Sequence, residues 1–271
     1  MQNKDQQKKR MTHFIFLFIS FFASVIGCIC GIGGGVIIKP VMDAFGLYSV
    51  SAVSFMSGCI VLSMTAYSVL REKLSHTNTR TESVGTYLGI GAAFGGLAGK
   101  QLFDAVKGLL ANANEVGAVQ AAALLLITLL TALYTVNREK IPSHRVKKPA
   151  ACVLIGLALG LISAFLGIGG GPVNLVVLFY FFSMETKTAA HNSLYIILLS
   201  QIASLVYTVL CGRVPEVPAC LLLCMVGCGI LGGVVGRRIN RKISSRTVDK
   251  LFLIMLVMIM CVCVYNFFLY V

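Results

Sequence analysis

Two copies of the pentapeptide Gly-Ile-Gly-Gly-Gly, at residues 31–35 and 167–171, stand inside long apolar stretches at an offset of 136 positions. Each glycine costs a helix roughly 1 kcal/mol relative to alanine, so both segments are expected to interrupt a helix. Inside a bilayer, such an interruption is tolerated only where it is buried in protein or lines a watery cavity. An interruption repeated in corresponding positions of two halves is typical of the binding site of a secondary transporter.

The composition indicates a membrane protein with several spans. Apolar residues make up 57% of the 271 residues, charged residues only 12%, and the mean hydropathy is +0.87. A soluble domain of this length cannot bury that much apolar surface. Most uncharged runs match the roughly 20 residues that cross a bilayer core; they cover residues 14–38, 49–70, 116–137, 150–184, 188–212, 217–236 and 251–271, and a shorter eighth run covers 83–99. We therefore predict an all-α polytopic membrane protein.

The net charge of +13 comes largely from basic clusters at the ends of these runs. The clusters lie before residue 14, in 137–149 and in 237–250, as the positive-inside rule describes for cytoplasmic segments. No aromatic residues alternate with them in the way that single-strand binding requires. The first apolar run lacks a clear signal-peptide cleavage site and is expected to be retained. We therefore expect the lipid bilayer as a partner, and no nucleic acid.

The ten cysteines lie almost entirely inside the apolar runs. Cys220, Cys224 and Cys228 recur every four residues and continue into Gly232 and Gly236. Such a stripe of small residues allows close packing of membrane helices, which is the interpretation we favour. The alternative is a soft-metal or sulfur site on the three thiols. We expect no metal, no cofactor and no catalytic residue.

The glycine segments belong to two repeats, residues 14–136 and 150–271, joined by the basic linker 137–149 and preceded by the basic segment 1–13. Such internal similarity is the mark of a repeated architecture. Ser57 matches Ser193 at the offset of 136, and after a one-residue slip Gly95, Gly96, Gly99 and Lys100 match Gly232, Gly233, Gly236 and Arg237.

The apolar run 150–184 is too long for one helix across the bilayer core and too short for two. We therefore predict a long helix, a break at the glycines and a short half-helix. The first repeat has the same pattern, with a short segment that ends near Gly46. Each repeat is predicted to hold about four full transmembrane helices plus one half-helix.

The charges also predict how the two repeats are oriented. With 137–149 and 237–250 both cytoplasmic, matching spans run in opposite directions, which is the signature of inverted repeats. One observation conflicts, because a strict five-element inverted repeat places the N-terminus outside although residues 1–13 are basic. Either the first short segment does not fully cross, or the charge rule fails at that end.

The segment Gly-Ile-Gly-Gly-Gly-Val-Ile-Ile-Lys-Pro at 31–40, followed by Gly46 and Ser-Ala-Val-Ser-Phe-Met-Ser at 51–57, resembles the TauE/SafE sulfite exporter family, also called the TSUP permeases. Related segments follow in the second repeat, so the resemblance extends from about residue 14 to the end of the chain. It implies a multi-pass permease of the inner (plasma) membrane that moves small organic or sulfur-containing anions such as sulfite, sulfonates or thiosulfate.

The second repeat departs from the family pattern at one point. Val176 stands where the first repeat has Pro40, and Pro172 directly follows the glycines instead. Proline suits the first turn of a helix, so the second half-helix is expected to begin more sharply.

Half-helices that begin at the two breaks would present free backbone N–H groups and the positive ends of their dipoles to a common cavity. We therefore predict that a small anion binds at Gly33, Gly34 and Gly35 of the first repeat and Gly169, Gly170 and Gly171 of the second. The alternative is that the glycines only allow helices to cross closely.

Polar residues at membrane depth are further candidates. We predict that Ser57, Asn174, Asn192 and Ser193 hydrogen-bond the anion, and that His191 carries a coupling proton, because histidine ordinarily titrates near neutral pH. Three alternatives stay open. Asn174 caps its own helix, the serines bond their own backbone, or His191 is an interfacial residue bound to water.

Lys39 and Asp43 are charged residues in the first half-helix. We expect Lys39 to extend its ammonium group to the membrane surface or to a vestibule. Asp43, one turn later, is expected to pair with it.

Together these features predict a secondary transporter for small anions. No Gly-x4-Gly-Lys-[Ser/Thr] segment for nucleotide binding occurs in the chain. A passive anion channel is the first alternative, and a membrane-embedded sulfur or metal enzyme is the second. The faces of small residues leave a homo-oligomer open.

Overall fold

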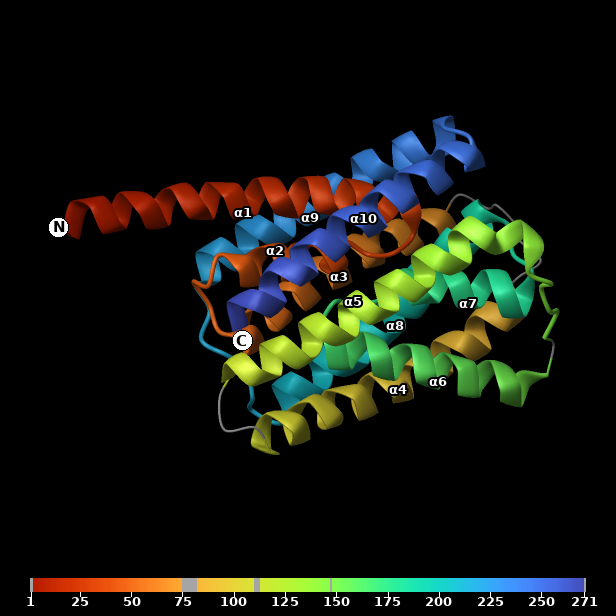
Figure 1. Cartoon of the computed structure of the whole chain (residues 1–271), viewed down its shortest axis with the longest axis horizontal. Helices are drawn as coiled ribbons and strands as arrows, with labels where there is room; N and C mark the ends of the chain where they lie inside the picture. Colours follow the sequence, from red (N-terminus) through yellow and green to blue (C-terminus); the bar gives the residue numbers. More distant parts are fainter. Residues whose placement is uncertain (1, 75–81, 110–112, 147, 271) are drawn as a thin grey trace.

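The computed structural model describes residues 2–74, 82–109, 113–146 and 148–270, which form one helical bundle (Figure 1). Within these residues there is no strand. The elements are α1 (Gln2–Cys30), α2 (Gly35–Ala44), α3 (Val50–Lys73), α4 (Glu82–Leu109), α5 (Ala113–Asn137), the short 3-10 helix η1 (Arg138–Lys140), α6 (Pro149–Leu166), α7 (Pro172–Phe182), α8 (Thr186–Leu210), α9 (Ala219–Lys242) and α10 (Ser245–Tyr270).

Seven helices in the described part of the chain are long and apolar enough to cross a membrane, namely α1, α3, α5, α6, α8, α9 and α10. The prediction of an all-α polytopic membrane protein is therefore confirmed. The predicted eighth run, 83–99, lies in α4, whose 28 residues include seven glycines. This helix is long enough to cross but is not among the seven apolar ones.

The same series of helices occurs in both halves of the chain. In α1–α5 and again in α6–α10, a long helix is followed by a half-helix, α2 or α7, and then by three long helices. The halves interleave, because α1 packs most extensively on α9 and α4 on α6. Since α6 corresponds to α1 and α9 to α4, these are two copies of one contact.

Glycines make these two contacts close. A Cβ added to Gly91 of α4 would lie 2.1 Å from the carbonyl oxygen of Val153 on α6, and one on Gly236 of α9 would lie 2.5 Å from that of Val25 on α1. Only residues without a side chain let two backbones approach in this way, as is common at membrane helix interfaces.

The cysteine part of the α9 stripe does not share in this packing. Cys220 and Cys224 are exposed and Cys228 is half-buried. Among the residues that the structure describes, no cluster of histidine, cysteine or acidic side chains is arranged to hold a metal. The predicted packing face is therefore correct for the glycines and wrong for Cys220 and Cys224, which lie on an uncovered face of α9.

Counterpart helices run antiparallel to each other. A Cβ on Gly117, at the start of α5, would lie 2.6 Å from the ring of Tyr270, at the end of α10. Likewise Glu72, at the end of α3, lines the same cavity as Lys187 at the start of α8. A two-fold axis that relates these pairs must lie across the helices, so the prediction of inverted repeats is confirmed.

The bundle has two ends, which we call the linker face and the terminal face. The linker face carries the loop between α5 and α6 and the ends of α3 and α9, whereas the terminal face carries the start of α1 and the end of α10 (Figure 1). The basic residues in 137–149 and 237–250 lie at the linker face, which the positive-inside rule therefore predicts to be cytoplasmic. Helix α1 begins at the opposite face, so the basic residues of the N-terminal segment do not share the face of these two clusters.

Candidate functional site

Both glycine segments interrupt the helices. In the first repeat α1 ends at Cys30 and α2 begins at Gly35, and in the second α6 ends at Leu166 and α7 begins at Pro172. After each break the half-helix turns back along the helix that precedes it. In the first repeat Phe45, after α2, packs on Phe16 of α1 with ring centroids 5.4 Å apart.

The backbone of the two breaks has the same left-handed turns. Gly31 and Gly33 have φ angles of 76° and 71°, and their counterparts Gly167 and Gly169 have 65° and 70°. Only glycine adopts these angles without strain. The repeated Gly-x-Gly spacing is thus a conformational requirement of both breaks.

The breaks meet in the middle of the bundle. A Cβ on Gly33 would lie 3.6 Å from the carbonyl oxygen of Gly169, so the two segments are in contact. Val61 of α3 and Ile197 of α8 pack beside them, and both are fully buried. Each lies near the centre of its helix, so the breaks are at mid-membrane depth.

The half-helices begin with free backbone groups and no side-chain cap. Gly34 is the N-cap of α2 and Gly171 that of α7, and neither start has a side-chain hydrogen bond. Pro172 occupies the first turn of α7, in agreement with the sharper start expected. The first N–H groups of a helix lack partners within it and lie at the positive end of its dipole, so each start can donate to an anion.

Ser57, Ser193 and Asn174 are at least 99% buried, and their side-chain polar atoms have no hydrogen-bond partner in the protein. Ser57 lies at the start of α2, where its Oγ is 2.9 Å from the position of a Cβ on Gly35. Ser193 lies one turn before Ile197, the α8 residue that contacts the breaks. These polar atoms are available to a ligand at mid-membrane depth.

Two of the alternative roles are therefore wrong. Asn174 does not cap α7, and neither Ser57 nor Ser193 bonds its own helix backbone. A buried polar group without a partner costs about 1–3 kcal/mol, so these side chains favour the binding of a polar ligand.

Asn192 and His191 are placed away from the breaks. Asn192 donates from Nδ2 to the carbonyl oxygen of Thr188 at 2.9 Å, and its Oδ1 faces Gly85 of α4. His191 lines a cavity at the linker face. The structure thus places Ser57 against the first break, Asn174 in the first turn of α7 and Ser193 one turn from Ile197, but not these two residues.

Lys39 does not reach the surface, contrary to expectation. Its side chain is 4% exposed, and Nζ lies 2.7 Å from Oδ2 of Asp43, which is the predicted partner. The pair lines a small cavity between α2, α5 and α10 together with Gln120 and Asn266. Because α2 folds back against these helices instead of crossing the membrane, the ammonium group stays inside the protein.

An open cavity of about 350 Å³ lies at the linker face between α1, α3, α8 and α9. It is lined by the basic side chains of Lys187, Arg237 and Arg241 and by one acid, Glu72. Arg237 donates to the Glu72 carboxylate and to the carbonyl oxygen of Ser68. Its Nε is buried without a partner. The excess of positive charge makes this cavity attractive to anions.

The open cavity extends inward to the first glycine break. Ala190 lines it, and a Cβ on Gly31 would lie 2.2 Å from the Cα of Ala190. His191 lines the same wall.

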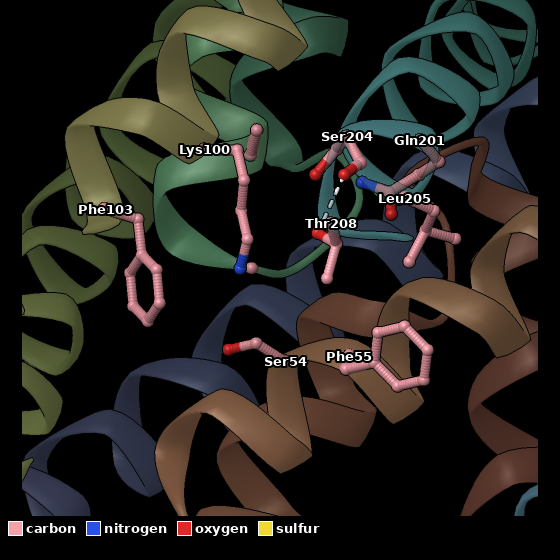
Figure 2. A pocket seen from close by; sticks show the side chains of 10 residues that line it. Ser54, Phe55, Lys100, Phe103, Gln201, Ser204, Leu205 and Thr208 are labelled. Carbon is pink, nitrogen blue, oxygen red and sulfur yellow. Dashed lines mark hydrogen bonds between the residues drawn. The ribbon is translucent and has the colours of Figure 1, made fainter. Parts of the chain in front are cut away.

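A cavity of about 20 Å³ lies on the terminal-face side of the breaks, between α3, α4 and α8. Figure 2 shows Lys100 reaching from α4 into this space towards Ser54 of α3 and Thr208 of α8. Its Nζ lies 4.5 Å from the centroid of the Phe103 ring. Gly167 of the second break lines the same space.

Three residues that line or adjoin the cavities were not predicted as site residues from the sequence, namely Arg237, Lys100 and Gln201. Gln201 is buried beside the second break, where its Cδ is 3.3 Å from the position of a Cβ on Gly169. The signal for the other two was present, because Lys100 and Arg237 match each other in the two repeats. A basic residue at one repeated position near membrane depth indicates a repeated function.

The family model of the sulfite exporter TauE/SafE family matches residues 16–263, nearly the whole chain. The chain belongs to the TauE/SafE family. No curated protein and no solved structure matches it. The resemblance seen in the glycine segments is confirmed, and this TauE/SafE protein is a multi-pass membrane transporter.

Proposed function

We propose that this TauE/SafE protein is a secondary transporter of small oxyanions, such as sulfite, sulfonates or thiosulfate, in the cell membrane. The anion binds between the starts of α2 and α7, where backbone N–H groups of both half-helices point to it. The nearest buried cation is Lys39, whose Cε lies 3.4 Å from the position of a Cβ on Gly167, and its ammonium group is paired with Asp43. The helix dipoles therefore supply the attraction for the anion, which can leave again.

The observation that carries the proposal is the set of polar atoms without partners at the breaks. Ser57 Oγ, Ser193 Oγ and Asn174 Nδ2 are buried donors at the starts of the half-helices or on the helix beside them. A close-packing role for the glycines does not explain why these three buried polar side chains lack partners. An oxyanion accepts hydrogen bonds from all three.

Electrostatics support an anion rather than a cation. The open linker-face cavity presents Lys187, Arg237 and Arg241 against one acid, Glu72. Charge of one sign in a cleft raises the local concentration of the opposite ion. The anion thus approaches along a basic wall and ends at the electropositive helix starts.

Support for a carrier over a channel comes from the closed contact at the breaks. Gly33 and Gly169 are in contact, and Val61 and Ile197 fill the space beside them with no exposure. A channel needs a continuous path for its ion in one state. A carrier needs a closed centre with access from one side at a time.

The test is sulfite binding and uptake by Ser57→Ala, Ser193→Ala and their double variant. Removing a buried hydroxyl without a partner leaves the folded protein equally stable or more stable. We expect each single substitution to weaken sulfite binding by about tenfold, the worth of one hydrogen bond to a charged group. Titration of the purified protein with sulfite, thiosulfate, methanesulfonate and acetate measures the affinities, and proteoliposomes measure uptake.

Ser200→Ala is the matched control. Ser200 is also on α8, two turns beyond Ser193, and it is fully buried without a partner; its Oγ lies 3.0 Å from the position of a Cβ on Gly96 of α4. Its loss should leave both affinity and uptake unchanged. Unchanged sulfite affinity in the Ser57→Ala, Ser193→Ala double variant would overturn the proposed site, and large single-channel currents would overturn the carrier.

A further inference from the structure

The two cavities are built from matching positions of the two repeats. The linker-face cavity is lined by Ser68, Ala190 and Arg237, and the terminal-face cavity by their counterparts Ser204, Ser54 and Lys100. The positions in each pair are 136 apart, or 137 for Lys100 and Arg237 after the one-residue slip. Inverted repeats place such pairs on opposite sides of the membrane.

Each cavity also ends at the first glycine of one break. A Cβ on Gly31 would lie 2.2 Å from Ala190, and one on Gly167 would lie 2.5 Å from Oγ of Ser54. These are again the same two positions of the repeat. The two cavities that lead from the membrane faces to the breaks are thus formed by equivalent positions of the two repeats.

The terminal-face cavity has the groups that an oxyanion needs. Lys100 is half-buried, and among the described residues no carboxylate pairs with its ammonium group. Asp104, one turn away, accepts instead from Arg213 in the loop after α8 at 2.6 Å, a contact that raises the pKa of Arg213 above its ordinary value. Across the cavity from Lys100, Ser54 Oγ is buried without a partner (Figure 2).

The matching cavities differ greatly in size. The one around Arg237 holds about 350 Å³ and opens at the linker face, whereas the one around Lys100 holds about 20 Å³. Equivalent residues of the two repeats therefore line a wide cavity on one side and a narrow one on the other. Inverted repeats transport by exchanging such shapes between the two sides.

We infer that Lys100 and Ser54 form an anion-binding site of the terminal-face vestibule, the counterpart of the Arg237 site, and that this structure is the state open to the linker face. In the opposite state the cavity around Lys100 widens and the one around Arg237 contracts. The inference rests on the proposed transport of oxyanions and adds the residue that receives the anion on the far side.

The experiment measures the concentration of radiolabelled sulfite that half-saturates uptake from each face separately. Right-side-out and inside-out membrane vesicles present the two faces of the full-length protein. For Lys100→Gln we expect the value for the terminal face to rise about tenfold, the worth of a charge-assisted hydrogen bond, with the linker-face value within twofold of wild type. Arg237→Gln is expected to do the reverse, and Lys100→Arg to behave as wild type on both faces.

Lys107→Gln is the matched control. Lys107 lies two turns further along α4 and donates to Ser51 Oγ at 3.1 Å, outside the cavity. Neither face should change. Ser54→Ala provides a second probe of the same cavity that leaves the charge of α4 intact, and we expect it to weaken uptake from the terminal face alone.

Equal effects of Lys100→Gln on both faces, or no effect on either, overturn the inference while wild-type transport stands. Absence of transport of sulfite, thiosulfate and methanesulfonate by the wild-type protein contradicts the proposed function instead, so the two failures are distinguishable.

Discussion

Val61 on α3 and Ile197 on α8 occupy matching positions of the two repeats, and both lie 3.4 Å from the position of a Cβ on the same glycine, Gly33. Both side chains are fully buried. Both are apolar and lie at the level of the glycine breaks, with the Arg237 cavity on one side and the Lys100 cavity on the other. We therefore expect this pair to seal the centre of the protein between the two cavities.

Shortening Ile197 should make the transporter leak. Ile197→Val removes one methylene from the contact with Gly33 and Gly170 at a cost of about 0.5–1.5 kcal/mol in the free energy of unfolding, whereas Ile197→Ala costs about 2–5 kcal/mol. Because the seal then no longer fills the space at the breaks, we expect sulfite efflux from preloaded proteoliposomes to rise several-fold in the absence of substrate outside.

Ile196→Val is the control for this prediction. Ile196 is as buried as Ile197 but belongs to the core cluster on another face of α8. It should lose similar stability without any rise in efflux. Equal leakage from both variants would mean that the efflux reports general loosening of the bundle and that the seal does not exist.

The first glycine of each break should tolerate no side chain. Gly31→Ala places an L-residue at a φ of 76° and brings its Cβ to 2.2 Å from Ala190. The left-handed conformation alone costs roughly 1–2 kcal/mol, and the backbone collision adds to it. We expect a fall in melting temperature well beyond that caused by strain alone.

Gly46→Ala measures the strain by itself. Gly46 has a φ of 61°, but a Cβ there would meet nothing within 4 Å. The free energy of unfolding of this variant should fall only by the roughly 1–2 kcal/mol that the strained backbone conformation costs. Identical melting temperatures for the two variants would contradict the close contact between Gly31 and α8.

The features that could be predicted from the sequence are those that depend on local composition. Glycines at repeated positions break helices wherever they occur, and the length of run 150–184 requires a break. The half-helices after both breaks and the antiparallel repeats followed from these facts and from charge. They needed no knowledge of which helix touches which.

What the sequence did not predict depends on how each helix is rotated against its neighbours. Asn192 and Ser193 are adjacent in the chain, yet Asn192 faces Gly85 of α4, whereas Ser193 is buried with no partner for its hydroxyl. Lys39 was expected at a surface but is buried, because α2 packs between other helices. A sequence predicts which face of a helix is buried only where the polar residues lie on one side of it. These helices are apolar on most sides, so their rotation could not be predicted.

Breaking the buried ion pair between Lys39 and Asp43 should be strongly destabilising. The two side chains are 4% and 5% exposed, so removing one partner leaves an uncompensated buried charge. Lys39→Met or Asp43→Leu alone is expected to cost about 3–5 kcal/mol in the free energy of unfolding, whereas the double variant should recover most of it. A double-mutant cycle on melting temperatures in detergent checks this, and additive losses would rule out the pairing.

Replacing Glu72 by glutamine should strengthen anion binding at the linker face. Arg237 donates to the Glu72 carboxylate, so an arriving oxyanion must compete with that carboxylate for the guanidinium. Glu72→Gln keeps the shape, removes the competing charge and raises the net positive charge of the cavity. We expect sulfite to bind several-fold more tightly at low salt, with a smaller gain at high ionic strength because partly exposed charges are screened.

Glu216→Gln is the control for this last substitution, since Glu216 is exposed in the loop before α9 and does not line the cavity. It makes the same change in net charge and should leave sulfite affinity unchanged. Calorimetric titration of both variants with sulfite at two salt concentrations decides the matter. Weaker binding by Glu72→Gln would mean that the carboxylate holds Arg237 in its binding position, and the competition argued above would be wrong.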